Sequence, residues 1–228
     1  MNTTPKHIGL ILDGNRRYAA KKMLPSYRGH EYGARKVEAL FDWCIALSIK
    51  ELTLYAFSME NFSRPKEELK FLWKLFEKEF KKMLNDSRIY KHKIKINFIG
   101  RINLFPKKVK EAMHKLMDAT KEHKRYVVNF AMAYSGRAEI IDAIKKLLTS
   151  KVNKRDINEK IILENLYLTK EPDLIIRTSG EQRISNFLLF QGAYAEWFFT
   201  KKLWPEFDKR DLIIAINDYK SRDRRFGR

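Results

Sequence analysis

The chain has 228 residues, 44% hydrophobic and 13% aromatic, which is enough for one large domain with a substantial core. Its 47 lysines and arginines outnumber 28 aspartates and glutamates, and the net charge of +19 attracts nucleic acid, anionic lipid or phosphorylated small molecules. The single cysteine, Cys44, excludes an intrachain disulfide, and its apolar surroundings predict a core thiol rather than a nucleophile. The sequence lacks the long apolar segment of a signal peptide or membrane span, so we expect a soluble, cytoplasmic protein.

The predicted elements alternate between strand and helix along the chain. Strands are predicted at residues 8–12, 51–58, 94–100, 126–134 and 173–180, with a sixth candidate at 195–200. Helices are predicted at residues 16–22, 31–47, 65–87, 106–122 and 137–149, and residues 150–160 are expected to form a surface loop with a short helix. Several strands are apolar at consecutive positions, which suits a parallel sheet covered on both faces. The sequence therefore predicts one α/β domain spanning residues 1–228.

Polar side chains that suit a phosphorylated ligand follow three of the predicted strands. They are Asp13, Gly14, Asn15, Arg16 and Arg17 after the first strand, Ser58, Glu60, Asn61 and Arg64 after the second, and Arg177, Thr178, Ser179, Arg183 and Ser185 after the fifth. Open α/β sheets bind ligands at such strand ends, and arginine donors fit phosphate oxygens bidentately. The pattern predicts a site for two diphosphates, in which Asp13 holds a magnesium ion against an anion.

Each feature also has an ordinary structural interpretation. Asp-Gly-Asn is a common turn, and His30 can simply start the helix that follows it. Arg177 alone can form a surface ion pair of little energetic worth. Glu60 and Glu68 can be solvated charges near a helix N-terminus. Three strand ends with the same chemistry nevertheless favour one binding site over three unrelated turns.

Five longer motifs resemble those of one enzyme family. They are "HIGLILDGNRRYA", "RGHEYG", "LTLYAFSMENFSRP", "DLIIRTSGEQRISNFLLFQGAYAEWFF" and "LWPEF", and their order and spacing resemble the cis-prenyltransferases of undecaprenyl diphosphate synthase type over nearly the whole chain. Arg16 with Tyr18 resembles the archaeal and eukaryotic members. The resemblance implies a six-stranded, mainly parallel sheet flanked by helices, a hydrophobic tunnel and a homodimer. It also implies Mg²⁺-dependent addition of isopentenyl diphosphate to farnesyl or geranylgeranyl diphosphate, giving a long Z-polyprenyl diphosphate that serves as a lipid carrier precursor for glycan synthesis.

The resemblance also implies a role for each matching residue. Asp13 is the implied catalytic, magnesium-binding carboxylate, Glu196 a second metal ligand, and Asn61 a participant in removing the proton from isopentenyl diphosphate. Because an amide is a poor base, we expect Asn61 to orient a proton relay. The implied substrate-binding residues are Gly14, Asn15, Arg16, Arg17, Tyr18 and His30 for the allylic diphosphate, Ser58, Met59, Glu60, Phe62 and Arg64 along the second strand end, and Arg177, Arg183, Ile184 and Ser185 for isopentenyl diphosphate.

Two further positions follow from the same resemblance. Arg225 and Gly227, in the C-terminal "RFG", are implied to reach the partner subunit's site. Ser26 stands where the family usually has an arginine, and Arg28 is the candidate to replace it.

A growing prenyl chain needs an apolar lining, and residues 65–84 offer one. This segment carries a wide apolar face made of Leu69, Leu72, Trp73, Leu75, Phe76, Phe80, Met83 and Leu84. Ordinary core packing with a dimer seam explains that face as well as a tunnel wall does. The small Ala56, on the strand that leads to Ser58, leaves room for a medium or long product.

Three other functions fit the sequence less well. A basic nucleic-acid-binding protein fits the charge, but the lysines are spread over helices and no RNA-recognition or zinc-finger signature occurs. A non-catalytic partner subunit of the same family is expected to lack the Asp13 turn and the arginine pair. A trans-prenyltransferase would bind magnesium through aspartate-rich runs, and no two aspartates are adjacent here. We therefore expect no nucleic acid partner, and expect the basic surface to favour peripheral contact with an anionic membrane.

Overall fold

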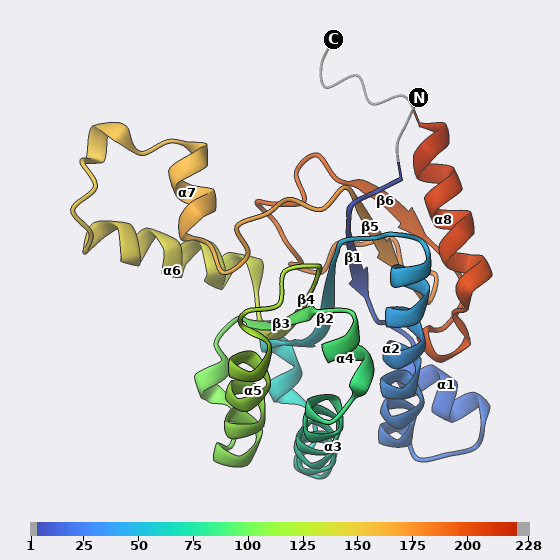
Figure 1. Ribbon diagram of the computed structural model, residues 1–228. Helices are drawn as coiled ribbons and strands as arrows, with labels where there is room; N and C mark the ends of the chain where they lie inside the picture. The colour runs from blue at the N-terminus through green and yellow to red at the C-terminus, as the bar shows by residue number, and fades with distance from the viewer. Residues whose placement is uncertain (1–3, 223–228) are drawn as a thin grey trace.

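Six strands form one parallel sheet in a computed structural model that describes residues 4–222 (Figure 1). The strands are β1 (His7–Ile11), β2 (Glu51–Ser58), β3 (Ile94–Ile99), β4 (Tyr126–Tyr134), β5 (Leu174–Arg177) and β6 (Glu196–Phe199), in the order β3-β4-β2-β1-β5-β6. Every neighbouring pair runs parallel, which confirms the predicted sheet and its sixth strand. The chain moves from β1 to one side first and returns to the other side at β5. In sheets of this kind the ligand crevice lies where the strand order reverses.

The helices match the five predicted ones and add three. The predicted helices correspond to α1 (Asn15–Lys21), α2 (Gly29–Ala46), α3 (Lys66–Leu84), α5 (Lys107–Thr120) and α6 (Gly136–Leu148). The predicted segment 65–87 is divided, because Asp86 caps a separate short helix, α4 (Ser87–Lys91). Residues 150–160 contain a loop with a short 3₁₀ helix at Lys154–Asp156, as expected, and lead into α7 (Glu159–Asn165), which was not predicted. The helix α8 (Lys209–Ser221) was not predicted.

The core has two parts, one on each face of the sheet. The larger part packs side chains of α2, α3, α5 and α8 against the strands, and it holds Cys44. Burial raises the pKa of the Cys44 thiol to about 12, so this cysteine is a core residue, as predicted. On the opposite face, Tyr134, Phe187 and Leu188 form a second cluster with Ile175. Here an irregular segment after β5, rather than a helix, covers the sheet.

The helices α6 and α7 extend away from the sheet, at the left of Figure 1. Ile141, Ile144 and Leu148 are exposed on α6. Their spacing places them on one face of the helix. No helix within residues 4–222 is long and apolar enough to cross a membrane.

Candidate active site

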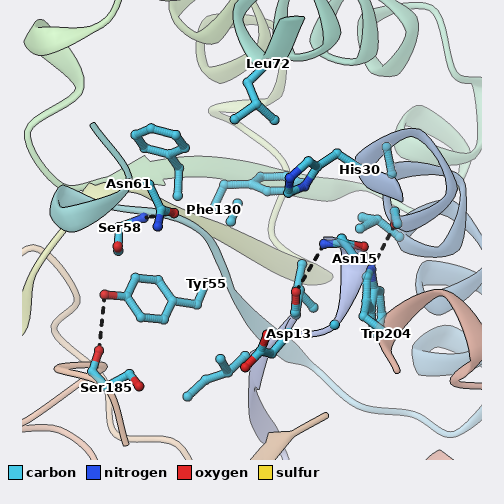
Figure 2. Close-up of a pocket in the computed structure, with 18 of the residues that line it drawn as sticks. Asp13, Asn15, His30, Tyr55, Ser58, Asn61, Leu72, Phe130, Ser185 and Trp204 are labelled. Atoms are coloured by element: carbon cyan, nitrogen blue, oxygen red, sulfur yellow. Dashed lines mark hydrogen bonds between the residues drawn. The ribbon is translucent and has the colours of Figure 1, made fainter. Parts of the chain in front are cut away.

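A cavity of about 990 Å³ opens at the carboxyl ends of β1, β2 and β5 and extends between the sheet, α2 and α3. This volume is at the upper end of the roughly 300–1,000 Å³ usual for small-molecule sites. Figure 2 shows Asp13, Asn15 and His30 on one side of the cavity and Ser58, Asn61 and Ser185 on the other. Most of its remaining wall is apolar and includes Val37, Phe57, Leu72, Leu75, Phe76, Phe80, Met83 and Phe130.

Most of the predicted site residues line this one cavity. They are Asp13, Gly14, Asn15, Arg16, Arg17, His30, Ser58, Glu60, Asn61, Arg64, Arg177, Ile184 and Ser185, with Ala56 on the wall beside them. These residues come from four separate parts of the chain. The structure therefore brings the three predicted strand ends together at one place.

Asp13 lies between two guanidinium groups. Its Oδ2 accepts a hydrogen bond of 2.9 Å from Nη2 of Arg177, and its Oδ1 lies 3.5 Å from Nη2 of Arg17. The backbone is fixed as well, because the Asp13 carbonyl accepts from the Thr178 hydroxyl at 2.6 Å and the Trp204 N–H at 2.9 Å. The carboxylate is thus held at the end of β1 by strand β5 and by the turn before α8.

The chemistry of Asp13 fits a magnesium ligand. Burial acts to raise its pKa, but the hydrogen bond and charge of Arg177, with Ser179 and Arg17, outweigh burial and hold the pKa below its usual value. The group is therefore ionised at neutral pH, and its side chain is 30% exposed. Within residues 4–222, no group of three or more acidic, histidine or cysteine side chains is arranged to hold a metal. Mg²⁺ is commonly bound through one or two carboxylates plus substrate phosphates, so a single carboxylate fits it.

Arg177 connects β5 to the turn that carries Ser185. Its side chain is 4% exposed, and Nη1 donates to Ser185 Oγ at 2.6 Å and to the Arg183 carbonyl. Ser185 and Asn186 both have positive φ, at 47° and 62°, a strained conformation for residues other than glycine. Arg177 stabilises this turn while its guanidinium faces the cavity beside Asp13.

A second buried cluster joins α2 to the start of α3. Nη1 of Arg64 lies 3.1 Å from Glu68 Oε1 and 3.2 Å from His30 Nε2. Burial lowers the pKa of His30 despite its contact with Glu68, so the ring is neutral at pH 7. Because Nε2 of this ring also lies 3.4 Å from Glu68 Oε1, it accepts from Arg64 or donates to Glu68 according to the ring tautomer.

Glu68 corrects one interpretation of the sequence. Its side chain is 4% exposed, so it is a buried partner of Arg64 and not a solvated charge. The contact with His30 and the charge of Arg64 hold the pKa of Glu68 below its usual value. Glu68 is thus the counter-charge that fixes two cavity-lining side chains.

Two glycines of "RGHEYG" let α2 approach the turn after β1. A Cβ atom on Gly29 would lie 1.9 Å from the Asn15 carbonyl oxygen, and one on Gly33 would lie 2.3 Å from Asn15 Oδ1. Only glycine leaves this space. The close approach fixes the Asn15 side chain at the cavity wall, where Nδ2 donates to the Leu12 carbonyl at 3.2 Å.

Asn61 is held by the turn after β2. Its Oδ1 accepts from the Ser58 N–H at 3.1 Å, which is half of a capping box on the short 3₁₀ helix Met59–Ser63. The oxygen is therefore used by the backbone, and the amide nitrogen, a donor, is the group left for a ligand. Its part in proton removal remains a prediction.

Four of the residues implied to bind substrate do not line the cavity. Tyr18 packs on Tyr32, with ring centroids 5.2 Å apart. Phe62 belongs to an aromatic cluster, and its ring centroid lies 5.0 Å from that of Phe57. Met59 packs against the main core. The fourth is Arg183, whose side chain is 60% exposed and pairs with Glu181. These side chains support the site or lie outside it within one chain.

Glu196 is not brought near Asp13 within one chain. It opens β6 and pairs in register with Leu174, the first residue of β5, whereas Asp13 follows the last residue of β1. The two carboxylates therefore lie toward opposite edges of the sheet, and Glu196 Oε2 accepts from Arg222 at 2.6 Å. The single-chain structure gives no support to a second metal ligand here.

Two other expectations from the resemblance concern Arg28 and the C-terminal segment, and the described residues do not support them either. Arg28 pairs with Glu31 at 2.9 Å and does not line the cavity, so its replacement of the arginine absent at Ser26 stays a prediction. Arg225 and Gly227 lie outside the described residues.

Arg137 and Asn186 line the cavity and were missed. Arg137 follows the carboxyl end of β4, and its N–H donates to Asn186 Oδ1 at 3.0 Å. Asn186 Nδ2 in turn donates to Ser135 Oγ at 2.7 Å. The sequence does carry a signal for them, because "YSGR" places a serine, a glycine and an arginine after a fourth strand. The same kinds of residue follow the three strands at which the site was predicted.

Comparisons with known proteins agree with this geometry. A family model described as "Putative undecaprenyl diphosphate synthase" matches residues 11–227. The tritrans,polycis-undecaprenyl-diphosphate synthases (geranylgeranyl-diphosphate specific) of Pyrococcus furiosus and Thermoplasma volcanium are each 46% identical over 98% of this chain, covering 87% and 89% of those proteins. A crystal structure of lavandulyl diphosphate synthase from Lavandula x intermedia, in complex with dimethylallyl diphosphate, is similar with a TM-score of 0.92 and 32% identity over 99% of both chains. This chain belongs to the undecaprenyl diphosphate synthase family of cis-prenyltransferases.

Proposed function

We propose that this protein adds successive isopentenyl diphosphate units to geranylgeranyl diphosphate, forming a tritrans,polycis-polyprenyl diphosphate of about undecaprenyl length. One observation carries the proposal: Asp13 lies between Arg17 and Arg177 at one end of a cavity whose other end is apolar. The choice of primer rests on the relatives, whose names specify geranylgeranyl diphosphate. The expected role as a lipid carrier precursor for glycan synthesis is part of the same proposal.

The residues at the polar end of the cavity have separate roles in this reaction. Asn15, Arg16 and Arg17, at the start of α1, hold the allylic diphosphate, with His30 beside it. Arg177, with Ser185 and Arg137, holds isopentenyl diphosphate so that its alkene meets the allylic carbon. Mg²⁺ bound by Asp13 would neutralise charge that develops on the departing diphosphate. Asn61 orients the group that removes the proton.

The apolar wall would hold the growing chain as a tunnel. At about 0.8 kcal/mol per buried CH₂, each five-carbon unit gains on the order of 4 kcal/mol from an apolar lining. Phe57, Leu72 and Phe130 belong to both this wall and the main core. The apolar face of α3 thus serves core packing and chain binding together.

The alternatives have less support. A non-catalytic partner subunit is expected to lack Asp13 and the arginines that surround it. In this chain Asp13 is present and contacts Arg17 and Arg177. A nucleic-acid-binding function leaves the apolar wall of the cavity without a use.

A product assay tests the proposal. The protein is incubated with labelled isopentenyl diphosphate, Mg²⁺ and a 10-, 15- or 20-carbon allylic diphosphate, and the products are sized by chromatography. We expect a polyprenyl series that is fastest from geranylgeranyl diphosphate and is abolished by a chelator. The absence of any chain elongation with all three primers would overturn the proposal.

Peripheral membrane contact is part of the proposal. The neighbouring helices α3 and α5 expose Lys70, Lys74, Lys78, Lys107, Lys108 and Lys115. Each basic residue near an anionic surface contributes about 1 kcal/mol, and a bound polyprenyl chain leaves an apolar site slowly in water. We therefore expect anionic vesicles to raise steady-state turnover several-fold, neutral vesicles to have a smaller effect, and high salt to remove the difference. Equal turnover with and without vesicles would contradict this.

The proposed homodimer can be tested on α6. Its exposed side chains Ile141, Ile144 and Leu148 would be covered by a second copy of the chain. We expect Ile144→Asp to shift the protein from dimer to monomer in analytical ultracentrifugation. The control is Lys146→Asp, exposed on the other side of the same helix, which should leave the dimer intact. A wild-type monomer, or an Ile144→Asp dimer of wild-type affinity, would exclude this surface.

A further inference from the structure

One acidic side chain interrupts the apolar wall of the cavity. The cavity-lining residues of α3 recur at the spacing of one helix face: Leu72, Leu75, Phe76, Glu79, Phe80 and Met83. Glu79 occupies a position where the rest of this face is hydrocarbon. The other acidic side chains that line the cavity, Asp13 and Glu60, lie at its polar end, where the diphosphates are proposed to bind.

Glu79 has no close polar partner. Among the described residues, none forms a hydrogen bond or ion pair with its carboxylate; the charged groups that act on it over longer range are Lys78 and Lys82 of α3 and Arg35 and Glu38 of α2. Lys82 itself is paired with Glu38 at 2.5 Å. Burial raises the pKa of Glu79 above its usual value, so the side chain is already partly removed from water. Further desolvation by a hydrocarbon chain is therefore unfavourable.

The position of Glu79 along the helix matches the far part of a growing chain. Eleven residues of α3 separate it from Glu68, beside the proposed diphosphate site, which is about 16 Å at 1.5 Å per residue. Each new unit is inserted next to the diphosphate, so elongation pushes the opposite end of the chain along this wall. A short chain does not reach Glu79, and a longer one must pass it.

We propose that Glu79 is a specificity-determining residue that limits product length by opposing passage of the hydrocarbon chain. This inference rests on the proposed function. The carboxylate takes no part in the condensation itself, so its effect falls on which product predominates.

Product sizing tests the proposal. Glu79→Leu and Glu79→Gln are compared with wild type and with Glu77→Gln, a matched control on the same helix that pairs with Lys81 and does not line the cavity. With labelled isopentenyl diphosphate and geranylgeranyl diphosphate, we expect Glu79→Leu to lengthen the predominant product by at least one five-carbon unit. We expect a smaller shift for Glu79→Gln and none for Glu77→Gln.

Two results would overturn the proposal. The first is a Glu79→Leu product distribution equal to that of wild type, and the second is a distribution shifted to shorter chains, which would indicate that side-chain bulk rather than charge sets the length. The ratio of long to short products is read within each reaction, so a change in overall rate does not affect the outcome. If wild-type protein forms no polyprenyl product at all, the proposed function fails instead.

Discussion

Asp13→Ala is expected to lower the rate of isopentenyl diphosphate incorporation by about 10³-fold or more. Removing one preorganised electrostatic group commonly lowers kcat by about 10²–10³-fold, and Asp13 is proposed to bind the metal ion as well. Asp13→Asn should be nearly as inactive, because it keeps the shape of the side chain and removes its charge. Steady-state incorporation, measured with increasing Mg²⁺, checks both variants.

Glu181→Gln provides the matched control for Asp13. Glu181 also contacts Arg17, at 3.2 Å, but it does not line the cavity. We expect this variant to stay within about twofold of wild type, since exposed ion pairs contribute about 0–1 kcal/mol. Asp13→Ala should also lose about 1–3 kcal/mol of unfolding free energy, because Arg177 is left without its charged partner. Undiminished turnover in folded Asp13→Ala would remove the residue from the mechanism.

The alternation of strands and helices made most of the fold predictable. Consecutive apolar residues indicated strands covered on both faces, and the sheet is parallel throughout its described pairings. The helix α8 escaped prediction because two exposed isoleucines mask the helical spacing of its buried residues. Leu212, Ala215 and Ile216 are buried, whereas Ile213 and Ile214 between them are exposed. Which of these side chains is buried depends on contacts with the distant strand β6 and the main core.

The polar end of the site was predictable for a different reason. In a parallel sheet all carboxyl ends of the strands meet at one edge, so residues after β1, β2 and β5 had to lie close together. The rule does not apply to Glu196, whose metal role only the resemblance implied: Glu196 opens a four-residue strand, and its distance from Asp13 depends on pairing with β5. The positions of the strand ends also do not tell which side chains are buried, because burial depends on packing between residues far apart in the sequence. In the sequence, Glu68 looks like a solvated charge in the first turn of a helix, yet contacts with His30 and Arg64 enclose it.

Glu68→Ala is the second change for which we expect a large effect. Removing one partner of a buried ion pair costs about 3–5 kcal/mol, and since Arg64 is 22% exposed we expect a loss of about 2–3 kcal/mol of unfolding free energy. Arg64 and His30 also lose the group that orients them at the cavity wall, where the allylic diphosphate is proposed to bind. We expect the KM for that substrate to rise at least tenfold, with a smaller change in kcat. Denaturant unfolding and steady-state kinetics measure the two effects separately.

The neighbouring residue Glu67 makes the comparison specific. It precedes Glu68 in the first turn of α3, and its side chain is 83% exposed. Among the described residues its carboxylate pairs only with Lys70, so Glu67→Ala should change stability by no more than about 0.5 kcal/mol. Glu68→Gln keeps a hydrogen-bond acceptor for Arg64 but removes the charge. If orientation of Arg64 is what matters, this variant recovers part of the lost substrate affinity. Equal effects of Glu67→Ala and Glu68→Ala would show that the buried cluster has no special role, and that a general change in helix charge explains both.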